Sequence, residues 1–392
     1  MTAAPTLPEH GGGAEEFRWL SIGAAIAAIS VVGMALGLGM PLFSVVLESR
    51  GHSASMIGLN TAIAGVASIV AAPFAAPLAS RFGVAATMLA MSLASVVAIV
   101  GLYLADAFWM WFPLRFVLHF GVTVLFVLSE FWITATAPPS RRGLVLGVYA
   151  TVLSLGFAVG PLIFSQIGSE GLLPFAIAAA MMLLVVPPLI AAWRESPDIS
   201  ASRPSARFSS YIFLVPTATA AVFVFGAVET SGFAFFPLYG TRLGYTQAEA
   251  ALLLTAVGLG NVLLQIPLGL LSDRMRDRRH LLIGCALIGL GGILALPFVA
   301  GDWYASAAIL FIWGGVVAGL YTVGLAHLGS RLTGRDLASA NAAFVFCYGI
   351  GMLAGPQAIG IGMDAFGTHG FAYVIAAFFA AYAVMAVMRV NR

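Results

Sequence analysis

The chain of 392 residues is 61% hydrophobic and only 9% charged, with a mean hydropathy of +1.01. A water-soluble protein of this length needs far more charged surface, so these values exclude an ordinary soluble globular protein. The net charge of +2 says little by itself, but the positions of the charges are informative.

Residues 1–17 are polar, glycine-rich and slightly acidic. They lack the basic start and the small-residue cleavage site of a secretory signal. The sequence therefore predicts a disordered cytoplasmic tail over 1–17.

Twelve apolar runs follow, each about 20 residues or longer, which is the length a helix needs to cross a hydrocarbon core of about 30 Å. They fall near 19–47, 54–80, 84–104, 108–136, 144–168, 172–193, 211–240, 247–272, 281–300, 304–328, 337–362 and 370–389. Backbone polar groups in lipid must be satisfied within the segment, and the runs are continuously apolar rather than alternating. The sequence therefore predicts an all-α membrane protein with twelve transmembrane helices.

Every basic residue of the chain is an arginine, and the arginines gather on one side of the predicted helices. If the N-terminus is cytoplasmic, only Arg50 and Arg242 lie on the far side. The cytoplasmic side then holds Arg18, Arg81, Arg141, Arg142, Arg194, Arg203, Arg207, Arg274, Arg276, Arg278, Arg279, Arg331, Arg335, Arg389 and Arg392. This bias predicts a multi-pass protein of a bacterial inner membrane with both termini cytoplasmic. Lipid head groups and orientation explain the scattered arginines better than nucleic acid does.

The sequence carries no signal for an enzyme, a metal or a cofactor. Cys285 and Cys347 lie far apart within apolar runs, which argues against a disulfide framework or a zinc site. A nucleotide-binding GxxxxGK[ST] loop is absent, which argues against ATP-driven transport by this chain. We therefore expect neither a cofactor nor an enzymatic activity.

An internal repeat divides the chain into an N-terminal six-helix bundle over 18–193 and a C-terminal one over 211–392. The longest polar interior stretch, 194–210, is the predicted cytoplasmic linker. Four ordered matches at offsets of 193 to 196 residues support the repeat: Pro41-Leu42-Phe43 with Pro237-Leu238-Tyr239, Gly51-His52-Ser53 with Gly244-Tyr245-Thr246, Ser80-Arg81 with Asp273-Arg274, and Gly156-x-x-x-Gly160-Pro161 with Gly351-x-x-x-Gly355-Pro356. Parallel repeats of this kind place a substrate site between the halves, near the membrane midplane.

These motifs carry a resemblance to the major facilitator superfamily. The stretch from Gly269 through Asp273-Arg274 to Arg278-Arg279 resembles the family's loop motif, and its first-half counterpart, Pro77 to Gly83, is degraded because serine replaces aspartate. Leu114-Arg115 with Gly121 is similar to a second motif, and Gly156 to Pro161 resembles a motif associated with antiporters. The resemblance implies the twelve-helix fold and a monomeric transporter of drug-antiporter-like or sugar-transporter-like type.

The loop motif implies a conformational gate at the cytoplasmic rim, formed by Arg81, Asp273, Arg274 and Arg278. The alternative is a plain turn with ordinary positive-inside arginines. The glycine motifs allow close helix packing, and their prolines bend the helices. We therefore expect a packing hinge at Gly156, Gly160, Pro161, Gly351, Gly355 and Pro356, with tight packing alone as the alternative.

Ionisable residues within the apolar runs are the sharpest functional signal, because a charge at membrane depth costs at least ~2.5 kcal/mol. Arg115, His119 and Glu130 fall within a sector of about 60° on one helix. By the resemblance, that helix lines the central cavity. Arg115 is a candidate for substrate binding, and His119 and Glu130 are candidates for proton coupling. The alternative for Arg115 and His119 is a structural hydrogen-bonding role. The alternative for Glu130 is that it anchors Arg81, Arg141 or Arg142 at the cytoplasmic rim.

Glu229 is the strongest candidate for proton coupling and for substrate binding. A carboxyl group that is neutral in a dry site and ionised in a wet one is suited to carrying protons. Phe233 and Phe236 lie on the same side of its run and could stack on a flat or cationic substrate. Asn341, Tyr348 and Trp313 are further candidates for substrate binding, with interhelical hydrogen bonding or packing as the alternative.

The sequence therefore favours a secondary active transporter of a small organic solute that works by alternating access within the lipid bilayer. Proton-coupled efflux by antiport is the leading hypothesis. Proton-symport uptake of a sugar or an organic acid, and a non-transporting membrane sensor or scaffold, are the alternatives.

Overall fold

The computed structural model describes residues 18–138, 142–199, 209–332 and 334–390, and no strand occurs within them. The predicted tail 1–17 and residues 200–208 of the predicted linker lie outside these residues. The helices are α1 (Trp19–Ser49), α2 (Ala54–Phe82), α3 (Val84–Leu104), η1 (Phe108–Met110), α4 (Trp111–Thr136), α5 (Arg142–Ile167), α6 (Leu173–Leu183), α7 (Val186–Ala191), η3 (Trp193–Glu195), α8 (Ser209–Leu214), α9 (Pro216–Arg242), α10 (Gln247–Arg274), α11 (Arg278–Val299), α12 (Trp303–Val317), α13 (Gly319–Arg331), α14 (Gly334–Phe366) and α15 (Gly370–Val390). In the described part of the chain, twelve segments are long and apolar enough to cross a membrane, which confirms the predicted helices.

Some predicted runs are interrupted, and proline explains two of the interruptions. The run 172–193 forms α6 and α7, with Pro187 and Pro188 in the first turn of α7. Proline lacks the N–H that would continue the preceding helix, and it fits a first turn, where that N–H is not needed. For the same reason α9 begins at Pro216 rather than at residue 211. The run 304–328 is divided into α12 and α13 at Ala318.

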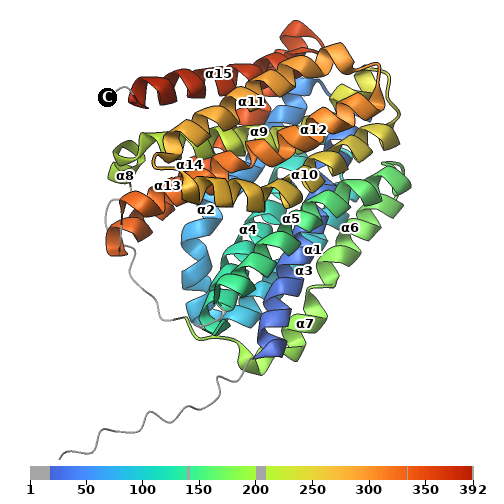
Figure 1. The fold of residues 1–392 in the computed structure, drawn as a ribbon. Coiled ribbons are helices and arrows are strands. Elements are labelled where there is room, and N and C mark those ends of the chain that lie inside the picture. Colours follow the sequence, from blue (N-terminus) through green and yellow to red (C-terminus); the bar gives the residue numbers. More distant parts are fainter. Residues whose placement is uncertain (1–17, 139–141, 200–208, 333, 391–392) are drawn as a thin grey trace, which may run out of the picture.

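The two halves, α1–α7 and α8–α15, repeat one local design, which confirms two pseudo-symmetric six-helix bundles (Figure 1). The turn after α1 uses Gly51 at φ +85°, and the turn after α9 uses Gly244 at φ +99°, a conformation that favours glycine. Ser53 then caps α2 and Thr246 caps α10, each through its side-chain oxygen. The matched glycines and caps therefore give the same helix–turn–helix unit twice.

The glycine motifs pack helices closely within each half. A Cβ atom at Gly156 would lie 2.8 Å from the carbonyl oxygen of Ser30 on α1, and one at Gly160 would meet the backbone of Gly37. In the second half, Gly351 and Gly355 of α14 face the backbone of Phe223 and Ala227 on α9 in the same way. The contact is therefore inside a half, and any hinge motion at these residues would move helices within a half.

The packing predicts that Gly355→Leu strongly destabilises the protein, whereas Gly291→Leu does not. The leucine at 355 has no room against the α9 backbone, whereas a Cβ atom at Gly291 of α11 meets nothing within 4 Å. Overpacking typically costs about 1–3 kcal/mol. We expect the thermal unfolding temperature of purified Gly355→Leu to fall by several degrees, with Gly291→Leu close to wild type. Equal unfolding temperatures for the two variants would contradict the packing argument.

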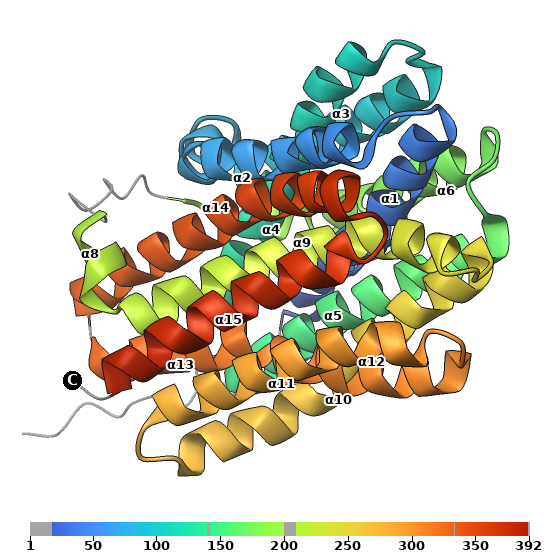
Figure 2. The same cartoon turned by 90° about the horizontal axis from the view of Figure 1, so that it is seen from above.

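Among the described residues, the main contacts between the halves are made by three helix pairs: α2 with α14, α5 with α10, and α1 with α9. Small residues allow the close approach, since a Cβ atom at Gly65 would lie 2.5 Å from the Leu353 nitrogen and one at Gly258 would lie 2.7 Å from Ala158 Cα. Figure 2 shows α9 between α14 and α15, and α9 also packs against α1, α10 and α13. In the most apolar 18-residue stretch of α9, 83% of the residues are buried, a larger share than in any other described membrane span.

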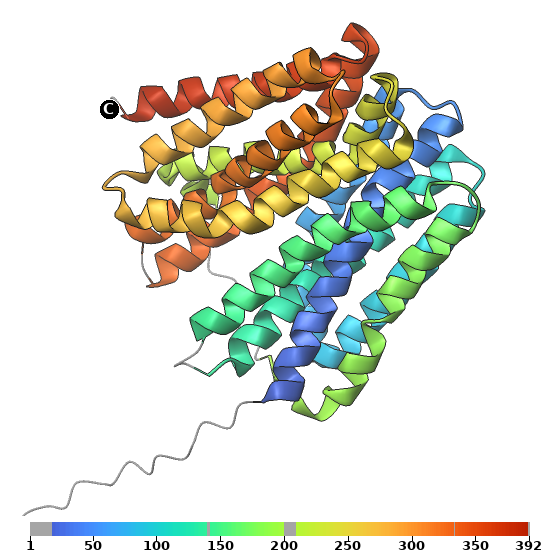
Figure 3. The ribbon, with the colours of Figure 1, turned by 45° about the vertical axis from the view of Figure 1, so that its right-hand side comes forward.

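The two halves approach each other at one end of the molecule and diverge at the other (Figures 1 and 3). We call these ends the closed face and the open face. The closed face contains the turn from α1 to α2 and the turn from α9 to α10. The open face contains the start of α1 and the end of α15. The hydrogen bonds described between the halves all lie at the closed face, where Glu48 pairs with Arg242 at 2.7 Å and Asp364 accepts from the backbone of α2.

Candidate functional site

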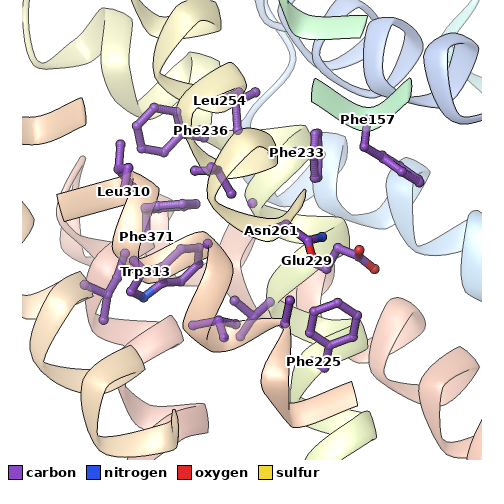
Figure 4. Close-up of a pocket in the computed structure, with 18 residues that line it drawn as sticks. Phe157, Phe225, Glu229, Phe233, Phe236, Leu254, Asn261, Leu310, Trp313 and Phe371 are labelled. Carbon is purple, nitrogen blue, oxygen red and sulfur yellow. The ribbon is translucent and has the colours of Figure 1, made fainter. Parts of the chain in front are cut away.

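Glu229 lines a pocket beside α9 with an empty volume of about 650 Å³, part of which is open to solvent (Figure 4). The predicted residues Phe233, Phe236 and Trp313 line the same pocket. Their neighbours are mostly apolar: Phe157, Phe225, Val228, Gly232, Leu254, Val257, Gly258, Asn261, Ile293, Leu310, Gly314, Val317, Ala318 and Phe371. No arginine or histidine occurs among the described residues of this lining.

The structure brings Glu229 and Tyr348 together. The Tyr348 hydroxyl donates a hydrogen bond of 2.6 Å to Glu229 Oε2. The two helices approach closely because α9 carries Gly226, where a Cβ atom would lie 2.5 Å from the Tyr348 carbonyl oxygen. In Figure 4 the Glu229 carboxylate points away from Trp313 and Phe371, toward the side on which Phe157 lies. One face of the pocket therefore carries a carboxyl group whose described hydrogen-bond partner is an uncharged phenol.

Aromatic rings from both halves surround this carboxyl group. Phe225 stacks on Tyr348 with ring centroids 6.2 Å apart and an interplanar angle of 29°. Phe157 of α5 meets Phe233 across the boundary between the halves, at 5.4 Å. Trp313 presents only its ring face, because its indole N–H donates to the Gly289 carbonyl at 2.9 Å. The pocket can therefore enclose a flat apolar group beside a carboxyl group.

Arg115 and His119 occupy a different place, in the interior of the first half. Arg115 is 1% exposed, donates to Thr61 Oγ1 at 3.0 Å, and lies over the Phe43 ring at 4.9 Å. His119 is 3% exposed and lines a small cavity of about 290 Å³ with Phe43 and other apolar residues. Neither residue lines the pocket of Glu229. The polar residues predicted to form one stripe on α4 therefore lie in different surroundings, with Arg115 and His119 buried in the first half and Glu130 exposed.

Asn341 and Glu130, which were also predicted, do not line the pocket. Asn341 is exposed, roughly two turns along α14 from Tyr348. Glu130 is exposed near the open-face end of α4, and it forms no salt bridge among the side chains that the structure describes. Asn261, which does line the pocket, accepts a hydrogen bond of 2.7 Å from Gln265.

The predicted gate residues lie at the open face and pair locally. Arg278, the first residue of α11, donates to Ser272 at 3.0 Å and pairs with Asp273 at 3.3 Å, both in the last turn of α10, and Arg274 is exposed. In the other half, the Arg81 guanidinium lies over the Phe82 ring. None of these three contacts crosses between the halves.

The next residues of this loop also pair with each other. Arg279 donates side-chain and backbone hydrogen bonds to Asp277, and the side-chain bond is the main reason that the pKa of Asp277 falls to about 2. The loop is therefore held by its own charges in this conformation.

Phe157 and Tyr149 are functional candidates that the sequence prediction missed. Both lie on α5, eight residues apart, so they share roughly one side of the helix. The first lines the pocket, and the second bonds to Ser129. Their helical spacing could have indicated that they share a side of the helix. Tyr149 carries no charge, however, and in the sequence Phe157 looks the same as a phenylalanine that faces lipid.

Comparison with known proteins identifies the fold family. The family model described as Major Facilitator Superfamily matches residues 25–251 and 218–392, which together cover nearly the whole described chain. The chain belongs to the major facilitator superfamily. It is therefore a multi-pass membrane transporter of this superfamily and not an enzyme.

Relatives of this superfamily member extend over most of its length. It is 27% identical over 359 residues to the uncharacterized MFS-type transporter YfkF of Bacillus subtilis (strain 168), covering 89% of this chain and 90% of the relative. It is 25% identical over 303 residues to the uncharacterized MFS-type transporter YcaD of Salmonella newport (strain SL254), covering 77% and 78%.

Solved structures of superfamily members share the fold. A bacterial homolog of the human lysosomal transporter Spinster, in an inward-facing and unoccupied conformation, has a TM-score of 0.71 and 15% identity over 96% of each chain. A mutant of the nucleoside transporter NupG has a TM-score of 0.78 and 12% identity, covering 94% of this chain and 99% of the other. At such identities the likeness concerns the fold alone.

Proposed function

We propose that this transporter exchanges protons for a small organic solute by alternating access, exports the solute, and uses Glu229 as the coupling carboxyl group. The observation that carries the proposal is the Glu229 site itself. A carboxylate in an apolar pocket is costly unless it is protonated or paired with a cation, and the described pocket lining supplies no cation. Either a proton or a bound solute can therefore satisfy Glu229, and competition between the two is what antiport requires.

The proposal is tested with the purified protein in proteoliposomes that enclose a pH indicator. After a pH gradient is imposed, drugs, sugars and organic acids are added one at a time. We expect at least one solute to trigger proton movement in the direction opposite to its own flux. Solute flux with no response to the pH gradient would overturn proton coupling.

A second candidate is proton-symport uptake of a sugar or an organic acid, and the surroundings of Arg115 favour it. Arg115 Nε and Nη1 are buried without a hydrogen-bond partner among the described residues, so an anion could bind there. Counterflow under opposite pH gradients separates the two candidates. An inward proton gradient accelerates solute accumulation in symport and solute loss in antiport.

From the arginine bias we also propose that the open face lies toward the cytoplasm of a bacterial inner membrane. By analogy with the superfamily we propose that the chain acts as a monomer. We expect a fluorescent protein fused after Arg392 to fold and fluoresce, and alkaline phosphatase fused at the same place to be inactive. The reverse pattern would place the termini outside. Light scattering of the purified protein should give the mass of one 40.7 kDa chain plus detergent.

A further inference from the structure

Gly232 of α9 is a helical glycine that close helix packing does not explain. Apart from proline, glycine is the least favourable residue in a helix interior. Two other glycines of α9 have a packing reason. A Cβ atom at Gly226 would lie 2.5 Å from the Tyr348 carbonyl oxygen, and one at Gly240 would lie 2.7 Å from Ala250. At Gly232 a Cβ atom would meet no described atom within 4 Å beyond its chain neighbours and its own helix backbone, so the space beside it belongs to the pocket that it lines.

Along α9, Gly232 lies between the coupling carboxyl group and the aromatic end of the pocket. Glu229, Gly232 and Phe236 line the pocket from successive turns, because they are three and four residues apart. Figure 4 shows the Glu229 carboxylate on the side toward Phe157 and Trp313 on the opposite side. A helical side chain leans over the turn that precedes it, so a side chain at position 232 would cover the turn that carries Glu229. The glycine therefore keeps open the way from the carboxylate to the rings.

The aromatic end of the pocket is held in place by contacts outside the pocket. The Trp313 indole N–H donates to the Gly289 carbonyl at 2.9 Å, and its ring meets Phe379 edge-on at 6.2 Å. Phe371 stacks on Tyr239 with ring centroids 4.8 Å apart. Fixed rings without a free hydrogen-bonding group suit a flat apolar ring and would leave the hydroxyl groups of a sugar unpaired.

We propose that the solute is a flat, ring-bearing organic molecule with a hydrogen-bond donor at one end, and that Gly232 determines how wide it can be. This inference rests on the proposed function, because it places the solute at the coupling carboxyl group. The donor, an amine or a hydroxyl group, bonds to Glu229, and the ring passes beside Gly232 to lie against Trp313 and Phe371. The pocket of about 650 Å³ lies within the size range of sites for such small molecules.

The first test compares two probes with the same fused rings, aminonaphthalene and methylnaphthalene substituted at the same ring position. Equilibrium dialysis measures their saturable binding to the purified full-length chain in lipid nanodiscs, with protein-free nanodiscs subtracted. We expect saturable binding of aminonaphthalene. Methylnaphthalene should bind about tenfold more weakly, because its methyl group cannot donate to Glu229. Absence of saturable aminonaphthalene binding, or equal binding of the two probes, would overturn this substrate class.

The second test changes only the size of residue 232. Gly232→Ala should weaken aminonaphthalene binding about threefold and Gly232→Phe at least about thirtyfold, because each added group occupies space that the ring needs. The space beside the glycine is open and both replacements favour a helix more than glycine does, so neither variant should unfold at a lower temperature than wild type. Gly291→Phe is the matched control and should bind like wild type. A Cβ atom at Gly291 also meets no described atom within 4 Å, and this residue does not line the pocket.

The outcomes separate this inference from the proposed function. Wild-type binding by Gly232→Phe would overturn the role of Gly232, and unfolding of that variant at a lower temperature would show that the space beside the glycine is not free. Binding that Gly232→Phe abolishes, without any proton flux in wild-type proteoliposomes, would support the inference and count against proton coupling. Proton-coupled transport of a solute that Gly232→Phe leaves unchanged would support the proposed function and overturn the inference.

Discussion

Glu229→Gln should reduce transport driven by a pH gradient to the background of empty liposomes. Glutamine keeps the size of the side chain, and its amide oxygen can still accept the hydrogen bond from Tyr348. It cannot gain or lose a proton, so the exchange between proton and solute is lost. The measurement is solute-triggered proton flux in proteoliposomes, and we expect a decrease of at least about 100-fold, equivalent to about 2.7 kcal/mol.

Two companion variants separate coupling from general damage. Tyr348→Phe leaves the carboxyl group in place and removes its donor, so transport should persist with a changed dependence on pH. Glu170→Gln should transport like wild type, because that side chain is exposed in a turn. If Glu229→Gln retained a pH-driven flux close to wild type, Glu229 would not be the coupling residue.

The sequence was sufficient to predict the architecture because bilayer thickness constrains it directly. Run length and continuous hydropathy gave the twelve helices, and the paired motifs Gly51-His52-Ser53 and Gly244-Tyr245-Thr246 gave the repeat that appears as two equivalent turns. Boundaries were less accurate wherever proline interrupted a run, as at Pro187 and Pro216. Hydropathy does not register a missing N–H group.

The candidate site was only partly predictable. The energetic cost of a charge in lipid singled out Glu229 as a candidate. Phe233 and Phe236 were predicted because they lie on the same side of its helix, and all three residues line the same pocket. Helical spacing placed Arg115, His119 and Glu130 on one side of α4, but it could not show that Arg115 donates a hydrogen bond to Thr61 and lies over the Phe43 ring. Those neighbours come from other helices, and contacts between helices depend on packing that one sequence does not reveal.

The double variant Asp364→Ala/Arg242→Ala should weaken the closed face and favour its opening. Asp364, at the end of α14, accepts hydrogen bonds from the backbone nitrogens of Ala54 and Ser55 at 3.1 and 2.8 Å, so its charge caps the start of α2 in the other half. Arg242 donates to Glu48 Oε1 at 3.0 and 2.7 Å. Each contact is partly exposed, so we assign about 1 kcal/mol to each. Together they should change the ratio of the two conformations by about 30-fold.

The change is measured as the distance between spin labels on cysteines introduced at Asp106 and Gly301, in a background with Cys285→Ala and Cys347→Ala. These two positions lie in exposed closed-face turns of opposite halves. Asp302→Ala is the matched control, since Asp302 caps α12 through the nitrogens of Tyr304 and Ala305 within its own half. It should lower stability but leave the distance distribution unchanged. A distribution in the double variant identical to wild type would mean that apolar packing of α2 on α14 alone keeps the face closed.

The ion pair at the closed face also explains why the repeat cannot be perfect. Glu48 and Arg242 lie in the last turns of α1 and α9, which are equivalent helices that meet between the halves. An identical repeat would bring like charges together there, and the face would repel itself. An acid in one half and an arginine in the other convert this repulsion into attraction. We therefore expect Arg242→Glu alone to open the closed face more than Arg242→Ala does, and the exchange Glu48→Arg/Arg242→Glu to restore the wild-type distance distribution.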